Sequence, residues 1–356
     1  MQVTIIKNNR GLALLMTLTV ITVLVTTALE FNRRARSAVF STAATRDRVT
    51  LSQMAASGIN VAMAILAKDK KESDTDSQQE DWANPEKIGE ILQDIPFEEG
   101  SLALKISDEL GRIQANALIR FPEGREADNL QIDLWDRFLR LIISANELAE
   151  IEPVTIINSV KDWLDSGDDD AITGLTGAES DCYQDSDPPY SCRNGPFTYI
   201  DELLLVRGVT PELFYGAGAK PGISGYMTVY GITGSNNKNF TCEGKININT
   251  AELPVLTSLL PPEDEDLAQL IYDYRLETSD GQYIHDLSSP MWYKNVPGCS
   301  GIEIDPKLIT TLSDLFRIES SATLHEMKIG ITAVVHREKE KKTGKWKCRI
   351  LSWQTG

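Results

Sequence analysis

The chain has 356 residues, of which 42% are hydrophobic and 24% charged, a composition that can bury the cores of about two domains. Its net charge of −17 argues against nucleic acid as a partner, because neutralising phosphates requires a cationic surface, and favours the binding of cations. None of the five cysteines forms a CxxC pair, which argues against a zinc ribbon or a thioredoxin-like site.

The N-terminus begins with a basic leader of eleven residues that ends at Gly11, and an uncharged run of eighteen residues follows, from Leu12 to Leu29. Eighteen helical residues span about 27 Å, close to the thickness of a bilayer core. The run is longer than the apolar part of a secretory signal, and no clear small-x-small cleavage site follows it. Basic residues flank both of its ends, so charge bias leaves the orientation open: Lys7 and Arg10 before it, and Arg33, Arg34 and Arg36 after it.

The helical pattern continues beyond this apolar run. No proline interrupts residues 12–68, and apolar residues recur at mostly three- and four-residue spacing. These residues are Leu51, Met54, Ala55, Ile59, Ala62, Ile65 and Leu66. We expect one long helix that is apolar all round in its first half and amphipathic in its second, where a sheet or another helix must cover the apolar stripe.

After this helix, the chain changes from strand patterns to helical ones. Residues 68–84 are polar and predict a loop, and residues 102–106 and 113–119 predict a hairpin through a turn at 108–111. Helical patterns then occupy residues 129–165, 199–205, 210–215, 251–260 and 267–275. Asn249 and Thr250 resemble an N-cap in front of Ala251.

Strand patterns return only at the end of the chain, in residues 327–338 and 346–354, which a basic turn joins. The first hairpin alone is too small to cover the long helix stably, so it should join these last strands in one antiparallel sheet. The sequence therefore predicts an α+β fold in which a large, mainly helical insert projects from the sheet.

The leader and the long helix together resemble the type IV pilin and pseudopilin class. The matching residues are Lys7, Asn8, Asn9, Arg10 and Gly11, followed by Leu12 onward. Members carry a short basic leader ending in glycine, then an apolar helix whose lower half packs on a small sheet. The resemblance implies that a prepilin peptidase cuts between Gly11 and Leu12 on the cytoplasmic side, after which Leu12 is methylated and the helix is retained.

One position departs from the usual pattern of this class. The fifth residue after the cut is Met16, where most pilins have a glutamate that neutralises the N-terminal ammonium of a neighbouring subunit. Burying either charge alone is costly, so a subunit without the glutamate suits the tip of a filament, where no subunit lies ahead of it. Absence of this glutamate is characteristic of the general secretion pathway protein K family, minor pseudopilins of type II secretion systems.

Four segments, the leader among them, resemble protein K, so that the resemblance covers nearly the whole chain: NNRGLALL, DWLDSGDDD…GAESD, TYIDELLLVRGVTPELF and KININTAELPVL. The resemblance implies a division into a leader and four further parts. These are the leader at 1–11, the transmembrane half of the helix at 12–29, the pilin-like helix and first strands at 30–122, an inserted SAM-like or helix-hairpin-helix-like domain at 123–312, and C-terminal strands at 313–356.

An acidic loop at residues 161–190 holds nine carboxylates against one lysine. So many carboxylates cannot approach one another without a counter-ion, and Ca²⁺ takes six to eight oxygen ligands of this kind. Glycines at 167, 174 and 177 would let the backbone fold around an ion, although the run does not match an EF-hand. Composition alone favours a solvated acidic loop over a calcium site.

Protein K members bind calcium through a DWxDxD-type segment and a downstream GAE segment, which the resemblance carries over to this loop. The predicted calcium ligands are Asp165, Asp168, Asp169, Asp170, Glu179, Asp181 and Asp187. Ser166 and Gly167 shift the second aspartate of the pattern, so the choice among residues 168–170 stays open.

The cysteines are candidates for disulfides if the body lies outside the cytoplasm. Cys182 and Cys192 are ten residues apart across a loop, and Cys242 with Cys299 forms a looser candidate pair, which leaves Cys348 over. The alternative is that all five are free, mostly buried thiols.

Three other functions compete with a role in secretion. A helix-hairpin-helix DNA receptor is disfavoured because the segment at its hairpin position, PPEDED, carries four carboxylates that would repel phosphate. An enzyme is not expected, since His285, His325 and His336 lack paired spacing and no GxSxG or P-loop occurs. A minor pilin of a type IV pilus shares the leader and the fold, but the helical insert and the DWLD…GAE segments argue against it.

By resemblance, we expect a minor pseudopilin at the tip of the type II secretion pseudopilus, needed for its assembly and for protein export across the outer membrane. The implied partners are the prepilin peptidase, the minor pseudopilins I and J, and either secreted substrates or the outer-membrane channel. The implied location is the bacterial inner membrane, crossed once, with a cytoplasmic N-terminus and a periplasmic body.

Overall fold

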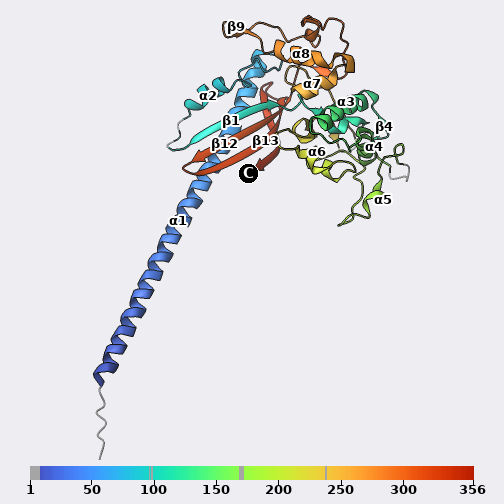
Figure 1. Cartoon of the computed structure of the whole chain (residues 1–356). Helices are drawn as coiled ribbons and strands as arrows, with labels where there is room; N and C mark the ends of the chain where they lie inside the picture. The colour runs from blue at the N-terminus through green and yellow to red at the C-terminus, as the bar shows by residue number, and fades with distance from the viewer. Residues whose placement is uncertain (1–8, 96, 98, 168–171, 237–238) are drawn as a thin grey trace, which may run out of the picture.

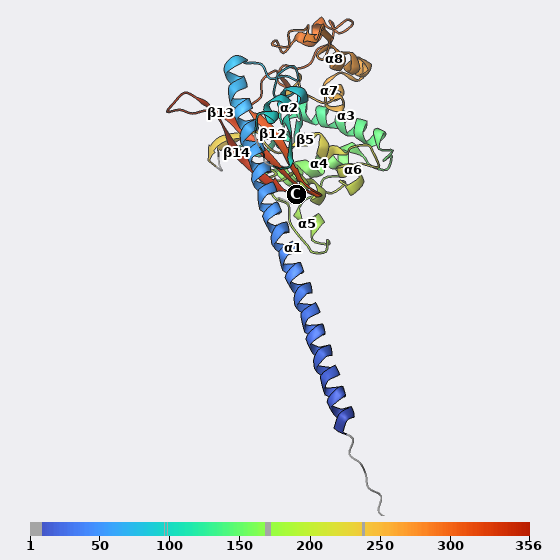
Figure 2. The same cartoon turned by 90° about the vertical axis from the view of Figure 1, so that its left-hand side faces the viewer.

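The computed structural model describes residues 9–95, 97, 99–167, 172–236 and 239–356 (Figure 1). One continuous helix, α1 (Asn9–Glu72), dominates its shape, and the first part of α1 extends away from the body in both views (Figures 1 and 2). The second part packs on a sheet, as its apolar stripe predicts. The stripe residues buried there are Leu51, Met54, Ala55, Ile59, Ala62 and Leu66.

A four-stranded antiparallel sheet covers this buried face of α1. Its strands, in spatial order, are β1 (Ser101–Asp108), β12 (Leu315–Leu324), β13 (Met327–Lys339) and β14 (Trp346–Thr355). The short helix α2 (Pro85–Gln93) follows the end of α1, and its N-cap Asn84 accepts a hydrogen bond from the backbone N–H of Glu86. The core between α1 and the sheet contains Phe316 and Trp82, whose rings meet edge to face at 5.2 Å.

The α+β class and the joining of β1 to the C-terminal strands are confirmed, but the predicted hairpin is wrong. β1 pairs along its whole length with β12, about two hundred residues later, so that Ser101 lies opposite Thr323 and Asp108 opposite Phe316. The segment after the turn does not return to the sheet, because Ile113 is fully buried in the core of the insert. Strand β12 was not distinguished in the sequence, since its serines, threonine and charged residues weaken the apolar alternation.

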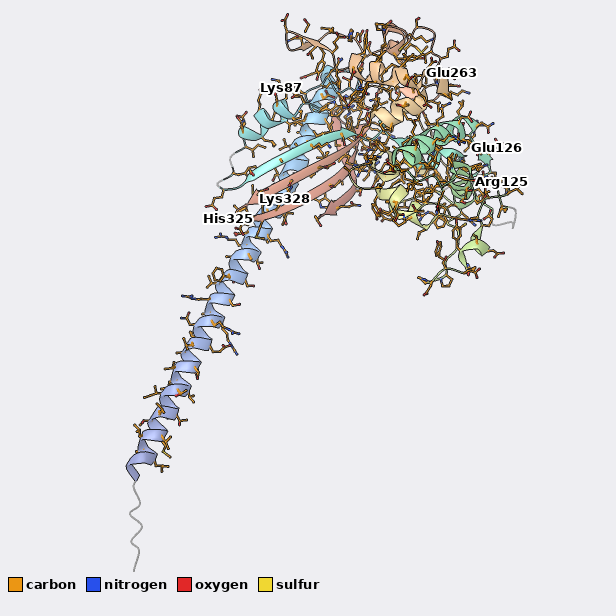
Figure 3. The ribbon with its side chains drawn as sticks, viewed as in Figure 1. Lys87, Arg125, Glu126, Glu263, His325 and Lys328 are labelled. Carbon is orange, nitrogen blue, oxygen red and sulfur yellow. The ribbon has the colours of Figure 1, made fainter. Side chains whose placement is uncertain are left out.

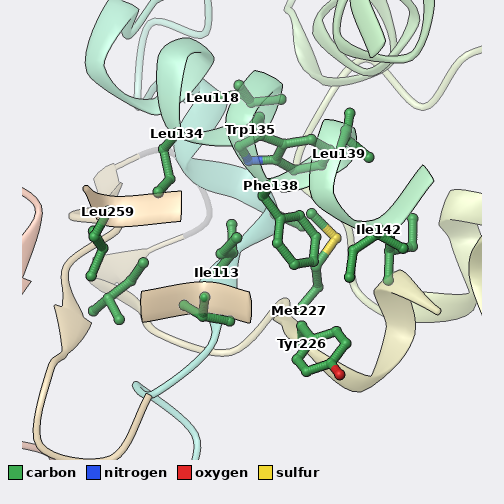
Figure 4. Close-up of a cluster of buried hydrophobic side chains, with 14 of the residues drawn as sticks. Ile113, Leu118, Leu134, Trp135, Phe138, Leu139, Ile142, Tyr226, Met227 and Leu259 are labelled. Atoms are coloured by element: carbon green, nitrogen blue, oxygen red, sulfur yellow. The ribbon is translucent and has the colours of Figure 1, made fainter. Parts of the chain in front are cut away.

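A second hydrophobic core is formed by residues from Ile113 to Ile309, and the predicted bounds of the insert, 123–312, stay a prediction. This core is separate from that beneath α1 and brings together side chains from the beginning, middle and end of the insert (Figure 4). Residues of this core include Ile113, Leu134, Trp135, Phe138, Met227 and Leu259. The chain therefore folds as a pilin-like unit with a second hydrophobic core inserted between β1 and β12.

The insert is mainly helical, as predicted. Its α-helices are α3 (Asn129–Ala145), α4 (Pro153–Leu164), α5 (Ser180–Tyr183), α6 (Pro211–Tyr215), α7 (Leu253–Leu259) and α8 (Ala268–Tyr274). Its 3-10 helices are η1 (Ala115–Leu118), η2 (Ile200–Leu205), η3 (Ile223–Gly225), η4 (Pro262–Leu267) and η5 (Trp292–Asn295). Its short ladders pair β2 (Ile113–Gln114) with β5 (Met227–Thr228), β3 (Ile119–Arg120) with β4 (Glu126–Ala127), β6 (Ile232–Asn236) with β7 (Asn239–Cys242), β8 (Ile246–Asn247) with β11 (Ile309–Thr310), and β9 (Thr278–Ser279) with β10 (Gln282–Tyr283).

The KININT segment holds the insert on the sheet instead of capping a helix. The predicted N-cap at Asn249 and Thr250 is wrong, because α7 begins later and its N-cap residue is Glu252. The Thr250 hydroxyl and the Asn247 amide donate to the Asp108 carboxylate at the end of β1, at 2.6 Å and 2.7 Å. These polar side chains are buried, so their hydrogen bonds fix one orientation of the insert.

Two ion-pair networks support the same junction. Glu109 accepts two hydrogen bonds from Arg317 of β12, at 3.0 Å and 2.8 Å. On the next strand, the buried Arg337 pairs with Asp69 of α1 at 2.9 Å and with Asp76 in the following loop. The networks join α1, the sheet and the insert through charges that would be costly to leave unpaired.

The junction predicts a pH dependence of stability. Burial raises the pKa of Asp108 from 3.8 to about 6, against the opposing effect of its hydrogen bonds. Between these values the folded state binds the additional proton, so the stability that this proton contributes is present below pH 4 and lost as pH rises through 6. From pH 5 to pH 7 we expect Asp108 to contribute a loss of about 1 kcal/mol to the stability of the full chain in detergent, measured by denaturant unfolding as the difference between the natural chain and Asp108→Asn.

Asp108→Asn removes this proton equilibrium and should flatten the profile relative to the natural chain. Asp280→Asn removes the same charge at an exposed turn and should leave the profile unchanged. Parallel profiles for the natural chain and Asp108→Asn would contradict the assignment.

Candidate functional site

The first part of α1 has the properties of a membrane-crossing helix. It is long and apolar enough to cross a membrane once, with a mean hydropathy of 2.3 in its most apolar window, none of which is buried in the protein. All eleven large apolar side chains from Leu12 to Leu29 are more than half exposed, so water is a poor solvent for this segment. The side chains along it point outward in all directions (Figure 3).

The polar side chains within this run satisfy their hydrogen bonds inside the helix. The hydroxyls of Thr19 and Thr22 donate to carbonyls four residues earlier, each at 2.7 Å, and the hydroxyl of Thr17 donates to the carbonyl of Leu14, three residues earlier, at 2.9 Å. Such bonds remove the cost of exposing a hydroxyl to lipid. Gly11 and Leu12, the residues of the predicted cut, lie near the start of α1, whereas Lys7 and the rest of the leader up to residue 8 fall outside the described residues.

The acidic loop places three carboxylates together beside α4. Ligand oxygens of Asp162, Asp165 and Glu179 all lie within 4.8 Å of one another. Asp162 is in the last turn of α4, Asp165 is the residue that ends this helix, and Glu179 immediately precedes α5. Asp162 and Glu179 are buried. The helix end and the short helix thus bring together carboxylates seventeen residues apart in the sequence.

The backbone around this group is shaped to approach a carboxylate closely. The backbone N–H of Thr173 donates to both oxygens of Asp162, at 3.0 Å and 3.1 Å. Gly177 lies so close that a Cβ at this position would overlap the Asp162 carboxylate. Only glycine fits here, which explains the glycine of the GAE segment.

The structure brings together only part of the predicted ligand set. Asp165 and Glu179 are in the group, whereas Asp181 and Asp187 are exposed and do not belong to it. Asp168, Asp169 and Asp170 lie outside the described residues, and their role stays a prediction. Asp162 was not among the predicted ligands, although the DWLD segment contains it. A charged residue on the buried face of a helix, next to Trp163, was the signal that could have identified it.

The donor set of this group fits calcium. All three side chains are hard oxygen donors, which are the kind of ligand that Ca²⁺ prefers. Two of the three carboxylates are buried, and a divalent cation would offset their mutual repulsion. Asp162, Asp165 and Glu179 would hold the ion.

A second group of carboxylates, Asp69, Asp76 and Glu80, differs in its surroundings. Arg337 pairs with both aspartates, and Lys70 lies 3.2 Å from Asp76. Burial raises the pKa of Asp69 to about 7, with a further rise from Glu80 and an opposing effect from Arg337. We interpret this group as the structural junction between α1 and β13, since its counter-charges belong to the protein.

The thiols of Cys182, Cys242 and Cys299 are unbridged in the structure. Both predicted disulfides, Cys182–Cys192 and Cys242–Cys299, therefore stay predictions for the protein in an oxidising compartment. Cys192 is buried and its thiol lies 3.4 Å from the carbonyl of Ala178, beside the acidic group. Burial raises the pKa of Cys242 to about 12, so its thiol is a poor nucleophile.

The fold and this site define a class of protein. A long N-terminal helix, exposed and apolar in its first half and packed on an antiparallel sheet in its second, is the pilin-like arrangement. Within the insert, residues 111–216 match the family model "Type II secretion system (T2SS), protein K". This segment is a protein K domain, which supports the resemblance to protein K that the sequence indicates; the chain as a whole is similar to protein K relatives in sequence over part of its length and to a solved structure in fold.

Relatives and a solved structure support the match. Type II secretion system protein K of Aeromonas hydrophila is 25% identical over 211 residues, which are 58% of this chain and 61% of that protein. The protein of the same name from Klebsiella pneumoniae is 24% identical over 208 residues, 58% of this chain and 60% of that protein. The matched region therefore spans about three fifths of the length of these relatives.

A chain in the crystal structure of the GspK-GspI-GspJ complex from the enterotoxigenic Escherichia coli type 2 secretion system superposes with a TM-score of 0.61. The superposition covers 88% of this chain and 99% of that chain, at 16% identity. This likeness establishes the fold across the pilin-like unit and the insert together.

The acidic site predicts a calcium-dependent melting temperature. A cation that binds only the folded state stabilises it by about 2.7 kcal/mol at a concentration 100-fold above its Kd. We expect the full chain in detergent to melt several degrees higher in calcium than in chelator, measured by differential scanning fluorimetry.

Asp162→Asn should abolish this difference, because it removes a central ligand charge. Asp185→Asn removes an equal charge from an exposed position in the same loop and should leave the difference intact. An identical melting temperature of the natural chain in calcium and in chelator would exclude the site.

Proposed function

We propose that this chain is a minor pseudopilin at the tip of a type II secretion pseudopilus, needed for pseudopilus assembly and for protein export across the outer membrane. The observation that carries the proposal is the protein K domain, inserted into a pilin-like helix-and-sheet unit. The role is structural rather than catalytic.

The apolar part of α1 anchors the chain in the bacterial inner membrane. A prepilin peptidase cuts after Gly11, and methylated Leu12 becomes the new N-terminus on the cytoplasmic side. The body then lies in the periplasm, at the opposite end of a helix of 64 residues. The exposed apolar surface from Leu12 to Leu29 supports this proposal, because its side chains must be covered either by lipid or by neighbouring apolar helices.

The middle of α1 supports association with other pilin-like subunits. Residues 30–50 have almost no cover from the body, and the apolar side chains of Val39 and Phe40 are 68% and 74% exposed. A stretch of helix without a packed face gains little stability in water. The minor pseudopilins I and J are the proposed partners that pack against it, and a complex of GspK, GspI and GspJ is the source of the similar solved structure.

The insert and Met16 favour the tip over the body of a filament. The insert projects to one side of α1 in Figures 1 and 2, where it would obstruct the stacking of further subunits around a thin filament. Met16 offers no carboxylate to the N-terminal ammonium of a subunit ahead of it. From the tip, the insert could contact secreted substrates or the outer-membrane channel.

Calcium has an ordering role in this proposal. The group formed by Asp162, Asp165 and Glu179 joins the end of α4 to the segment before α5. A bound ion would cross-link two parts of the insert that otherwise repel each other. A calcium-loaded insert is the form proposed for the periplasm.

Gene deletion tests the proposed function. In a deletion strain, exported proteins should accumulate in the periplasm, while twitching motility stays normal. The natural chain should restore secretion, whereas Gly11→Leu should fail, because the uncut leader keeps α1 out of the filament. Ala28→Leu adds bulk at the other end of the apolar run and should restore secretion.

Loss of twitching with normal secretion would instead assign the chain to a type IV pilus. Normal secretion and normal twitching in the deletion strain would contradict both roles.

A further inference from the structure

We propose that Arg33, Arg34 and Arg36 form an arginine collar that binds the phosphate groups of anionic lipids in the leaflet nearer the body. The inference rests on the proposed membrane anchoring of α1 and goes beyond it, since it assigns a lipid class and the residues that recognise it. The collar would fix how deeply α1 sits in the bilayer.

The geometry of α1 places the collar at headgroup depth. The helix is continuous from Asn9 to Glu72, so distance along it follows from the rise of about 1.5 Å per residue. Arg33 lies about 6 Å beyond Leu29, the last residue of the apolar run, and Arg36 about 10 Å beyond it. The headgroup layer is about 5–8 Å thick on each side of the hydrocarbon core, within reach of these long side chains.

The guanidinium groups of the collar are open to solvent on the helix surface. The side chains of Arg33 and Arg34 are 84% and 79% exposed, and Arg36 is exposed as well. Glu30 is the only acidic residue of α1 between residues 9 and 46. Its carboxylate lies 2.9 Å from the guanidinium of Arg34 and 3.7 Å from that of Arg33. The four residues therefore carry a net charge of +2, because three positive charges meet one negative charge.

The acidic body of the same chain is too distant to neutralise the collar. The body first meets α1 at Asp47, where His325 lies 3.9 Å from its carboxylate, about 16 Å beyond Arg36 along the helix. This distance exceeds the Debye length of about 8 Å at physiological ionic strength. Phe31, 74% exposed, lies within the same turn, where an aromatic ring suits the boundary between hydrocarbon and headgroups.

The chemistry of the collar selects anionic phosphate over the zwitterionic headgroups that form a neutral bilayer. Guanidinium groups are always charged and pair with phosphate oxygens through two parallel hydrogen bonds. Each basic residue at an anionic membrane surface strengthens binding about 5-fold. Removal of two collar arginines should therefore weaken the preference for anionic lipid about 30-fold.

The test uses the full chain reconstituted in vesicles of phosphatidylcholine with one quarter phosphatidylglycerol. After mild detergent extraction, native mass spectrometry counts the two lipids that stay bound. The natural chain should retain phosphatidylglycerol in large excess over its share of the vesicle. Arg33→Gln/Arg36→Gln should lose this excess, and raised salt should weaken it in the natural chain.

The helix offers a matched control. Arg46→Gln/Arg48→Gln removes the same charge at positions about 26 Å and 28 Å beyond Leu29, outside the headgroup layer, and should keep the excess. A bound-lipid ratio equal to that of the vesicle, or equal losses in both double variants, would overturn the collar. Release of the natural chain from vesicles by alkaline carbonate would instead overturn the proposed anchoring itself.

Discussion

The structure depends on one constraint: the apolar side chains of a single continuous helix must be covered by two different surroundings. Its second half is satisfied within the chain, where Leu51, Ile59 and Leu66 are removed from water by a four-stranded sheet. Its first half exposes every large apolar side chain and has no cover from the protein. This asymmetry explains why the chain needs an environment outside itself, first a bilayer and then, as we propose, neighbouring helices of a pseudopilus.

Local patterns were sufficient to predict the elements that depend on nearby residues. The stripe from Leu51 to Leu66 identified the buried face of α1, and the patterns around α3 and α4 identified two helices of the insert. Pairing between distant strands was harder to predict. The partner of β1 is β12, which mixes serine, threonine and charged residues with its apolar ones, so a nearby candidate was wrongly preferred for β1.

The candidate metal centre was predicted in part for the same reason. Acidic composition pointed to the loop in which the structure places three carboxylates together, but composition does not distinguish a converging carboxylate from a solvated one. Asp162 was recognised as a candidate ligand only from the structure, which shows that it is buried, that the Thr173 N–H donates to both of its oxygens and that Gly177 approaches it closely. Asp181 and Asp187 belong to the same acidic run and yet remain at the surface. The KININT segment was mispredicted for the same reason: its polar residues resemble a helix cap in the sequence, but in the structure they form hydrogen bonds to Asp108, which is distant in the sequence.

The central claim is that the apolar half of α1 is a retained anchor, produced by a cut next to Gly11. The most direct measurement is the intact mass and N-terminal sequence of the protein purified from its native membranes. The account predicts a chain that begins at Leu12 and carries one additional methyl group on its amino terminus. A chain that begins at Met1, or one that begins after Ala28 and so has lost the apolar run, would contradict the account.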